Sequence, residues 1–333
     1  MAQTETIRVR AIRFSETGGP DVLSWEDVEL PAPGAGDVLV RHRAVGLNFV
    51  DTYFRSGLYP TRLPSGLGME AAGVVEAVGP DVSTLSVGDR VAYGTGPMGA
   101  YAEAAVVPAA GLVRVPDGVD DRTAAAAMLK GLTVQYLIRQ IHEVGTDTVL
   151  LGHAAAGGVG LILGQWAKAL GATVIGTAST EEKRTLALAN GYDHVIAYRD
   201  EGVDVAAEVR ALTGGRGVDV VYDGVGADTF NASLDSLRPR GLLVTYGNAS
   251  GPVPPFSPAI LSAKGSLFVT RPTLAHYADT PERTQAMADD LFAVLASGAV
   301  QVRIDQTYPL ADAARAHEDL EAGRTTGSTV LIP

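Results

Sequence analysis

The chain has 333 residues, 46% of them hydrophobic, and a formal net charge of −12. This length fits two domains, and the acidic charge argues against a general nucleic-acid-binding surface. The absence of cysteine excludes disulfides, thiolate zinc sites, iron–sulfur clusters and a cysteine nucleophile. No signal-peptide segment or membrane-length apolar run stands out, so we expect a soluble, cytoplasmic protein.

Short β-strands separated by glycine and proline are typical of residues 1 to about 125. Turn signals such as Pro31–Gly34 and Gly79–Asp81 lie between them. The candidate strands are Val38–Val45, Gly73–Gly79, Val87–Tyr93 and Ala102–Val107. Short strands at this spacing predict a small β-barrel or a partly open sheet.

Apolar strands alternate with helices from about residue 125 to residue 272. The predicted strands are Thr148–Leu151, Thr173–Thr177, His194–Ala197, Val218–Tyr222, Leu242–Tyr246 and Leu267–Thr270. The predicted helices between them are Val159–Leu170, Glu181–Asn190, Val203–Thr213 and Ala227–Leu237. Six short buried strands with helical crossovers predict a doubly wound parallel sheet in an α/β protein.

The pattern changes again after Pro272. A helix at Pro281–Ser297 precedes a strand near Val302–Tyr308, a helix near Ala311–Glu321 and a last strand at Thr329–Ile332. These pieces have no sheet of their own to complete. We therefore expect them to return to the first domain.

A glycine-rich turn joins the first parallel strand to its helix. Residues Ala154–Gly160 read Ala-Ala-Ala-Gly-Gly-Val-Gly, so Ala155 replaces the leading glycine of the usual G-x-G-x-x-G pattern. Small residues let the backbone approach a pyrophosphate, and the following helix offers free N–H groups. The order of strand, turn and helix predicts a dinucleotide site containing Gly157, Gly158, Val159 and Gly160.

The end of the second parallel strand distinguishes NADP from NAD. An NAD site usually places an acidic residue there to bind the ribose 2′-hydroxyl. This chain has Thr177, Ala178 and Ser179 instead, followed shortly by Lys183. Hydroxyl and basic groups suit a 2′-phosphate, so we expect NADPH, although the same residues also read as a helix cap with a solvated basic face.

Several longer motifs in register resemble the zinc-independent, ζ-crystallin-like quinone oxidoreductases of the medium-chain dehydrogenase/reductase superfamily. The similarity covers essentially the whole chain. The motifs are Asn48–Tyr53, Arg55–Tyr59, Leu129–Thr133, His153–Gly160, Gln165–Lys168, Tyr246–Asn248 and Val269–Pro272. The resemblance implies a GroES-like, β-barrel-type catalytic domain at residues 1–125, completed by residues 273–333. It also implies a Rossmann NADP-binding domain with a six-stranded parallel sheet at residues 126–272, and an active site in the cleft between the domains.

Catalytic zinc is not expected. Zinc-dependent relatives carry a cysteine near the position of Asn48 and a His-Glu pair after Gly68, where this chain has Met69 and Glu70. Amide and thioether groups do not replace thiolate and imidazole ligands. The six histidines show no metal-binding spacing, and a structural role suits each of them.

The resemblance also implies roles for individual residues. Asn48 and Tyr53 would line the nicotinamide end, and Tyr59 would lie at the mouth of the acceptor pocket. The remaining implied cofactor residues are Lys130 and Thr133 on a facing helix, Gly158 and Val159 at the pyrophosphate, Lys183 and Tyr198 at the 2′-phosphate, and Asn248, Phe268 and Thr270 near the nicotinamide ribose and amide. Arg324 lies one place later than the family's phosphate-binding arginine, which puts its role in doubt.

Each assignment has a structural alternative. Asn48 can be a turn cap, Tyr53 and Tyr59 core or rim aromatics, Tyr198 a strand-end aromatic and Lys130 a solvated helix residue. The expected reaction is NADPH-dependent reduction of a quinone, which needs no strong general acid because solvent can supply the proton. The alternatives are reduction of activated C=C bonds, with Tyr59 as proton donor, and a cofactor-retaining crystallin-like or RNA-binding role. The apolar strand Gly265–Thr270 predicts a homodimer paired edge to edge.

Overall fold

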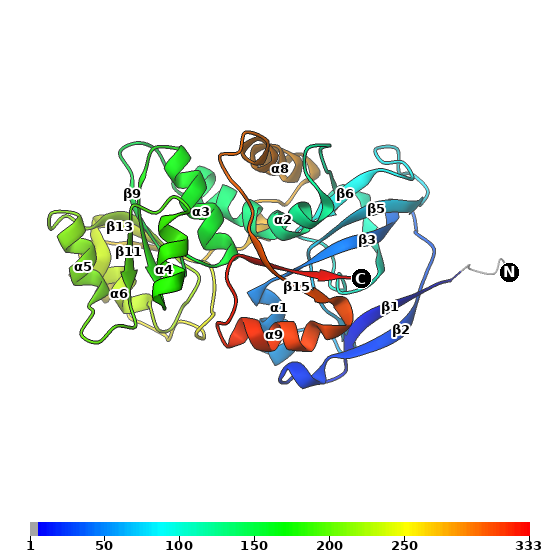
Figure 1. The fold of residues 1–333 in the computed structure, drawn as a ribbon, viewed down its shortest axis with the longest axis horizontal. Helices are drawn as coiled ribbons and strands as arrows, with labels where there is room; N and C mark the ends of the chain where they lie inside the picture. Colours follow the sequence, from blue (N-terminus) through cyan, green and yellow to red (C-terminus); the bar gives the residue numbers. More distant parts are fainter. Residues whose placement is uncertain (1–5) are drawn as a thin grey trace. The chain divides into compact units, whose positions relative to one another are not determined.

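A computed structural model describes residues 6–333 of the chain (Figure 1). Residues 1–5, part of the segment examined for a signal peptide, lie outside the described residues. The chain forms two compact units: the first runs to Leu132 and includes residues 277–296 and 302–333, and the second consists of residues 133–276 and 297–301. The first division falls inside helix α2 (Asp121–Gln135), which continues as a π-helical segment, Tyr136–Ile141.

A six-stranded parallel sheet forms the second unit, in the order β11-β10-β9-β12-β13-β14. The strands are β9 (Val149–Gly152), β10 (Thr173–Ala178), β11 (His194–Ala197), β12 (Val218–Asp223), β13 (Leu237–Thr245) and β14 (Phe268–Thr270). The strand order reverses between β9 and β12, the switch point at which doubly wound sheets bind ligands. The predicted parallel doubly wound sheet is confirmed.

Four main helices accompany this sheet, with α3 packed beside α4 and α5 beside α6 (Figure 1). They are α3 (Gly158–Ala169), α4 (Glu181–Leu188), α5 (Val205–Leu212) and α6 (Phe230–Ser236), and a short α7 (Ala259–Ala263) precedes β14. Each lies within about three residues of its predicted ends, which is the usual uncertainty of boundaries read from sequence.

Glycines bring α3 close to the sheet. A Cβ atom at Gly164 or Gly176 would lie 2.4 Å and 2.7 Å from ring atoms of Tyr192, so the ring occupies space that these glycines leave open. The Tyr192 hydroxyl donates a hydrogen bond to the Gly160 carbonyl at 2.9 Å. This buried tyrosine therefore ties the first turn of α3 to the rest of the unit.

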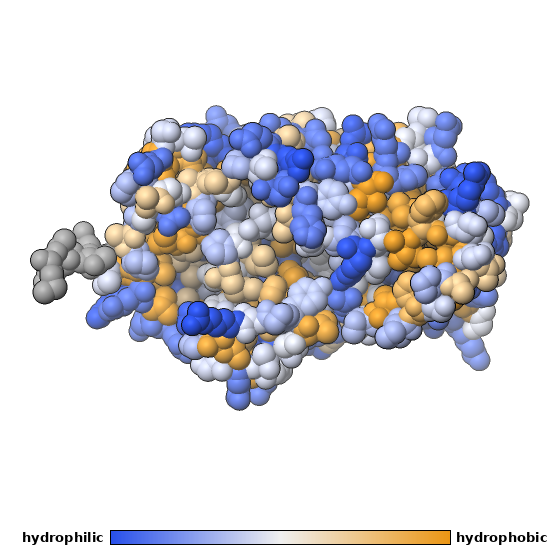
Figure 2. Space-filling view, turned by 180° about the vertical axis from the view of Figure 1, so that it is seen from behind, coloured by the Kyte–Doolittle hydropathy of each residue, from blue (hydrophilic) through white to orange (hydrophobic). Residues whose placement is uncertain are grey.

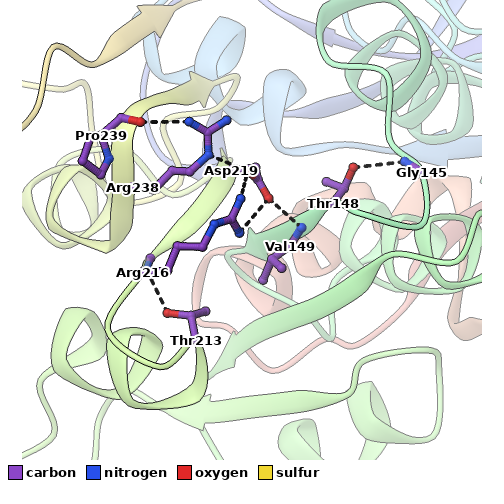
Figure 3. A network of polar contacts seen from close by, with 9 residues as sticks. Gly145, Thr148, Val149, Thr213, Arg216, Asp219, Arg238 and Pro239 are labelled. Atoms are coloured by element: carbon purple, nitrogen blue, oxygen red, sulfur yellow. Dashed lines mark hydrogen bonds and ion pairs between the residues drawn. The ribbon is translucent and has the colours of Figure 1, made fainter.

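Asp219 joins the amino ends of β9 and β12 (Figure 3). Its Oδ1 atom accepts hydrogen bonds from Arg216 and Arg238, both at 2.5 Å, and its Oδ2 atom accepts the Val149 N–H at 2.9 Å. Hydrogen bonds from these partners lower the pKa of Asp219, although burial alone would raise it. This network lies at the sheet end opposite the glycine turn.

The first unit contains a seven-stranded sheet and a three-stranded sheet, whose strands are mainly antiparallel. Its strands are β1 (Ile7–Phe14), β2 (Ser24–Leu30), β3 (Asp37–Leu47), β4 (Ser65–Gly66), β5 (Ala71–Val78), β6 (Arg90–Tyr93), β7 (Ala104–Pro108), β8 (Val113–Arg114), β15 (Ile304–Pro309) and β16 (Ser328–Ile332). Its other helices are α1 (Phe49–Ser56), α8 (Pro281–Ala296) and α9 (Ala313–Glu321). The described chain also has 3-10 turns at Pro20–Val22, Ala109–Gly111, Leu274–His276 and Leu310–Asp312.

Residues 277–296 and 302–333 of the C-terminal segment belong to the first unit, and residues 273–276 and 297–301 belong to the second. Strand β16 pairs antiparallel with β3, with Val330 opposite Gly46, and β15 pairs parallel with β16. Strands β1 and β2 and helix α1 were not predicted. Helix α1 lies in the part of the chain that was interpreted as short strands separated by glycine and proline.

Candidate active site

Asn48 lies between strand β3 and helix α1, and its side chain is buried against Glu70. The Asn48 Nδ2 group donates a hydrogen bond to Glu70 Oε2 at 2.7 Å. The Asn48 backbone N–H donates to Asp51 Oδ2 at 2.9 Å, which fixes the start of α1. Asn48 is thus both the residue that precedes α1 and a member of a buried polar cluster.

Lys130 belongs to the same cluster. Its ammonium group lies 3.0 Å from Glu70 Oε2, and the Leu129 N–H donates to Glu70 Oε1 at 2.6 Å. The side chains of Glu70 and Lys130 are 0% and 7% exposed. The structural alternative of a solvated helix residue is therefore wrong for Lys130.

Two tyrosines lie at the other end of α1. The rings of Tyr53 and Tyr59 pack edge to face with centroids 5.3 Å apart, and the Tyr59 N–H donates to the Tyr53 carbonyl at 2.9 Å. Phe54 makes a second edge contact with Tyr59 at 5.6 Å. Tyr53 is buried and Tyr59 is half-buried, so the two predicted site tyrosines form one aromatic group.

A buried chain of hydrogen bonds holds α1 to α9. Arg55 binds Glu321 with two hydrogen bonds, at 2.7 and 3.0 Å, and its Nη1 group lies 3.1 Å from His317 Nδ1. His317 Nε2 lies 3.1 Å from the hydroxyl of Tyr101, which donates to Asp51 Oδ2 at 2.9 Å. Arg55 can only donate, so His317 carries its proton on Nε2, and the hydrogen bonds from Arg55 through His317 and Tyr101 all point toward Asp51.

Burial shifts the pKa values of Asp51 and His317, two members of this chain, in opposite directions. Burial raises the pKa of Asp51 to about 7, and it lowers the pKa of His317 to about 3 with a further contribution from the positive charge of Arg55. The Asp51 Oδ1 atom is buried and has no hydrogen-bond partner. Burial therefore favours the neutral form of each side chain.

In the second unit, helix α3 begins at the glycine turn without a side-chain cap. Its N-cap residue is Gly157, whereas Thr180 caps α4 and Asp204 caps α5 through side-chain oxygens. A Cβ atom at Gly160 would lie 2.4 Å from the Ala154 carbonyl, so the turn leaves no room for a side chain there. The first N–H groups of a helix lack partners within it and mark its positive end, so the turn fits a pyrophosphate.

A buried polar network adjoins the glycine turn through His153, the residue directly before it. His153 Nδ1 lies 3.0 Å from Thr177 Oγ1, and His153 Nε2 lies 3.0 Å from Ser233 Oγ. Ser233 and Thr229 donate to Asp223 Oδ2 at 2.8 and 2.7 Å. Burial lowers the pKa of His153. The network joins the carboxyl ends of β9, β10 and β12, and sequence analysis gave no sign of it.

Two cations lie where the second and third parallel strands end. The pKa of Lys183 is lowered, first by its burial and then by the positive charge of Arg199. Arg199 lies over the ring of Tyr198, 5.8 Å from its centroid, and Ser179 directly follows β10. Such mutual repulsion favours a bound anion. Arg199 was not predicted as a site residue, although it directly follows Tyr198 in the sequence.

Arg184 is used differently from Lys183. Its Nε group donates to the Val195 carbonyl at 3.0 Å, and its Nη1 group pairs with Glu181 at 3.2 Å. A cavity of about 340 Å³ adjoins Tyr198 on the same unit. Its other lining residues are His153, Val203, Asp204, Val205, Asp228, Thr229 and Ala232.

The remaining predicted cofactor residues are dispersed. Asn248 is half-buried after β13, Phe268 and Thr270 lie on the edge strand β14, and Thr133 is buried in α2. Arg324 lies in the first unit, where its Nε group donates to Asp319 at 2.6 Å. Its guanidinium group therefore already has an acidic partner.

Among residues 6–333 there is no group of three or more histidine, cysteine or acidic side chains arranged to hold a metal. Nor does any helix of this part of the chain have the length and apolarity needed to cross a bilayer. Where zinc-dependent relatives carry the cysteine and the His-Glu pair, this chain has Asn48, Met69 and Glu70, and Asn48 binds Glu70 by a hydrogen bond.

Two family models match the chain. Residues 34–117 match the alcohol dehydrogenase GroES-like domain, and residues 158–289 match the domain described as zinc-binding dehydrogenase. With the parallel sheet and glycine turn of the second unit, they define the class: an oxidoreductase of the medium-chain dehydrogenase/reductase superfamily with a GroES-like and a Rossmann-type domain.

Full-length relatives narrow this class. A quinone oxidoreductase of Pseudomonas aeruginosa is 57% identical over 325 residues, 97% of this chain and 99% of the relative. The crystal structure of Escherichia coli quinone oxidoreductase complexed with NADPH, 48% identical, matches with a TM-score of 0.95 over 97% of this chain and all of that chain. A 2-haloacrylate reductase of a Burkholderia species is 45% identical over 98% of this chain and 99% of the relative. The chain belongs to the quinone oxidoreductase family.

Proposed function

We propose that the protein reduces quinones with NADPH. The observation that carries the proposal is the pair of cations, Lys183 and Arg199, at the sheet end that also bears the uncapped glycine turn. A 2′-phosphate would relieve the repulsion between these cations, and NADH has no such group. The names of the relatives, and the NADPH complex of the E. coli enzyme, support the same conclusion.

The nucleotide would be held mainly by the second unit. The N–H groups of Gly158, Val159 and Gly160 would bind the pyrophosphate, and Gly157, whose own N–H donates to the Ala154 carbonyl, would let the backbone approach it. Ser179, Lys183, Tyr198 and Arg199 would bind the 2′-phosphate. The cavity beside Tyr198 is of a size to take part of the adenosine. The other proposed cofactor residues are Asn48, Lys130, Thr133, Asn248, Phe268, Thr270 and Arg324, the last only if it exchanges Asp319 for phosphate.

Catalysis would depend on positioning rather than on acid–base groups. When bound, the reduced nicotinamide supplies a hydride. Asn48, Tyr53 and Tyr59 would orient the acceptor and exclude water. Holding the acceptor in the right orientation next to the nicotinamide favours hydride transfer. The hydride reduces the quinone, one oxygen takes the negative charge, and a proton from solvent completes the hydroquinone.

Steady-state turnover of a panel of electron acceptors tests this proposal. We expect steady turnover of 1,4-benzoquinone and naphthoquinones with NADPH, and a clear preference for NADPH over NADH in both turnover and calorimetric titration. The absence of binding heat with NADPH, or a preference for NADH, would contradict it.

Reduction of activated C=C bonds is the second candidate, favoured by the 45% identity to a 2-haloacrylate reductase. In that reaction Tyr59, half-buried beside Tyr53, would donate a proton to carbon. The two candidates differ in the effect of Tyr59→Phe, which removes the hydroxyl but keeps the ring that would orient the acceptor. It should abolish turnover of 2-alkenals or enoyl thioesters and lower quinone turnover far less. The panel therefore includes a crotonyl thioester, a 2-alkenal and 2-chloroacrylate.

We also propose a cytoplasmic homodimer. NADPH is an intracellular coenzyme, which supports the location. Strand β14 forms one edge of the six-stranded sheet, and the side chain of Phe268 on it is 61% exposed. Figure 2 shows the molecule from behind, with apolar side chains gathered at the right of the view. An exposed apolar edge strand is suited to pairing with a second copy about a twofold axis.

A further inference from the structure

Glu70 connects two parts of the first unit through one buried carboxylate. Its Oε2 atom accepts from Asn48 Nδ2 at 2.7 Å and from Lys130 Nζ at 3.0 Å, while its Oε1 atom accepts the Leu129 N–H at 2.6 Å. Asn48 follows β3, and Leu129 and Lys130 belong to α2. Three donors therefore converge on a side chain that is fully buried.

The space for this carboxylate depends on a glycine. A Cβ atom at Gly46 would lie 2.0 Å from Glu70 Oε2 and 2.4 Å from the Ala125 carbonyl. Any other residue at this position of β3 would displace Glu70 or push α2 away. The backbone of β3 is thus shaped to admit the Glu70 side chain.

These contacts determine how two groups of the candidate site are presented. An amide has one donor end and one acceptor end, so binding of Nδ2 to Glu70 fixes which way the Asn48 carbonyl points. An ammonium group has three N–H donors, and the ion pair with Glu70 uses one of them. A buried charge without a partner is strongly disfavoured, so Glu70 also allows Lys130 to stay charged while buried.

We propose that Glu70 is a positioning residue for quinone reduction, because its Oε2 atom holds the Asn48 amide and the Lys130 ammonium in the arrangement that hydride transfer needs. This inference rests on the proposed function. Glu70 does not itself contact the reactants in this account.

The first test is Glu70→Gln. A glutamine has one acceptor oxygen for three donors, so at least one of Asn48, Lys130 and the Leu129 N–H loses its partner. We expect kcat with 1,4-benzoquinone to fall about 10- to 100-fold, as for other residues that orient reacting groups. The KM for the quinone and the Kd for NADPH should change much less. Equal losses in kcat and NADPH affinity, or an unchanged kcat, would overturn the proposal.

Glu76→Gln is the matched control. Glu76 lies on β5, which begins directly after Glu70, and pairs with Arg41 at 2.9 Å with a side chain that is 47% exposed. The substitution is the same, but its site is on the surface. It should leave kcat, KM and the thermal midpoint close to those of the unmodified protein.

A double-variant cycle asks whether Glu70 acts through Lys130. We expect the Glu70→Gln/Lys130→Met variant to be no slower than the slower single variant, because both changes remove one arrangement. Effects that multiply would show independent action and refute the proposal. The double variant is also charge-balanced, so it provides the test if Glu70→Gln does not fold: a wild-type kcat in the double variant would equally refute it.

A spectroscopic measurement is independent of turnover. The chain has four asparagines, at 48, 190, 231 and 248, so asparagine-selective ¹⁵N labelling gives few side-chain signals. Asn48→Ala identifies the Asn48 pair, which should shift in Glu70→Gln and not in Glu76→Gln. An unshifted pair would contradict the positioning role. If the unmodified protein does not turn over quinones, the proposed function fails, whereas unchanged turnover in the Glu70 variants refutes only this inference.

Discussion

Asp51 presents one carboxylate oxygen to two donors and leaves the other without a partner. Oδ2 accepts from the Asn48 N–H and the Tyr101 hydroxyl at 2.9 Å each, while Oδ1 is buried and unpartnered. A protonated carboxyl suits this environment better than a carboxylate, in line with a pKa raised by burial to about 7. The same residue begins the chain of contacts that ends at Glu321.

The raised pKa of Asp51 makes stability fall as pH rises. Between its unfolded value of 3.8 and about 7, the folded carboxyl keeps a proton that the unfolded chain releases. Over that window the contribution amounts to about 4 kcal/mol, at 1.36 kcal/mol for each pH unit. Asparagine stays neutral at every pH. In urea unfolding, Asp51→Asn should therefore not show this fall in the free energy of unfolding.

Comparing Asp51→Asn with the unmodified parent protein separates the contribution of Asp51 to the pH dependence of stability from that of the buried histidines. His42 and His317 have pKa values lowered by burial to about 4 and about 3, so their contribution is lost as pH falls below 6.5, the opposite direction. Both histidines are present in either protein and cancel in the difference. Asp117→Asn, at an exposed loop position, should follow the parent at every pH. Parallel pH profiles for the parent and Asp51→Asn would disprove this account.

Lys183 should discriminate between the two nicotinamide coenzymes. The positive charge of Arg199 acts on its ammonium group, and a charge-assisted contact to phosphate contributes about 1.5–3 kcal/mol. Lys183→Met should therefore weaken NADPH binding about 10- to 100-fold and change NADH binding little. Calorimetric titration of both coenzymes measures this.

Arg184→Gln serves as the control for Lys183. Arg184 is adjacent in sequence, but its guanidinium group is held by the Val195 carbonyl and Glu181. NADPH affinity should stay close to that of the parent. Equal losses in the two variants would assign the effect to general charge rather than to Lys183.

At the scale of elements, we expect the carboxyl end of the parallel sheet to serve coenzyme binding and the amino end to serve stability. The carboxyl ends of β9, β10 and β12 meet in the His153–Asp223 network beneath the glycine turn. The amino ends of β9 and β12 are joined through Asp219, as Figure 3 shows. Substitutions at the two ends should therefore separate binding from stability.

Asp219→Asn should destabilise the protein without altering coenzyme affinity. The change weakens contacts to Arg216 and Arg238, whose side chains are 48% and 30% exposed, so we expect a loss of about 1–3 kcal/mol rather than that of a fully buried pair. Denaturant unfolding measures the loss, and calorimetry should give an unchanged Kd for NADPH. A weakened Kd with unchanged stability would reverse the assignment.

The predicted and observed elements differ where an element departs from the rhythm of its neighbours. The six parallel strands and the helices between them alternate regularly along the sequence, and the structure confirms them. Helix α1 stands alone among short strands, and three of its four buried side chains, Asp51, Thr52 and Arg55, are polar. Their partners come from other elements, and pattern analysis of a single segment does not detect such partners.

At the scale of the whole molecule, the edge strand β14 leads to a prediction about assembly. Sedimentation should give the mass of a dimer, and Phe268→Glu should convert it to a monomer, because a buried unpaired carboxylate opposes edge pairing. Leu188→Glu is the control, since Leu188 is also an exposed apolar residue of the second unit but lies on α4. A monomeric parent protein would contradict the prediction.

The sequence by itself determined the parallel sheet, the glycine turn and the return of the C-terminal segment, because their signals lie in contiguous residues with a fixed period or spacing. The motifs also pointed to Asn48 and Lys130, whose roles remain predictions. Only the tertiary structure decided that Glu70 joins these two residues, across 22 and 60 positions of sequence, and that Arg55 reaches Glu321 across 266. Such contacts depend on how distant elements pack, and no local backbone preference encodes them.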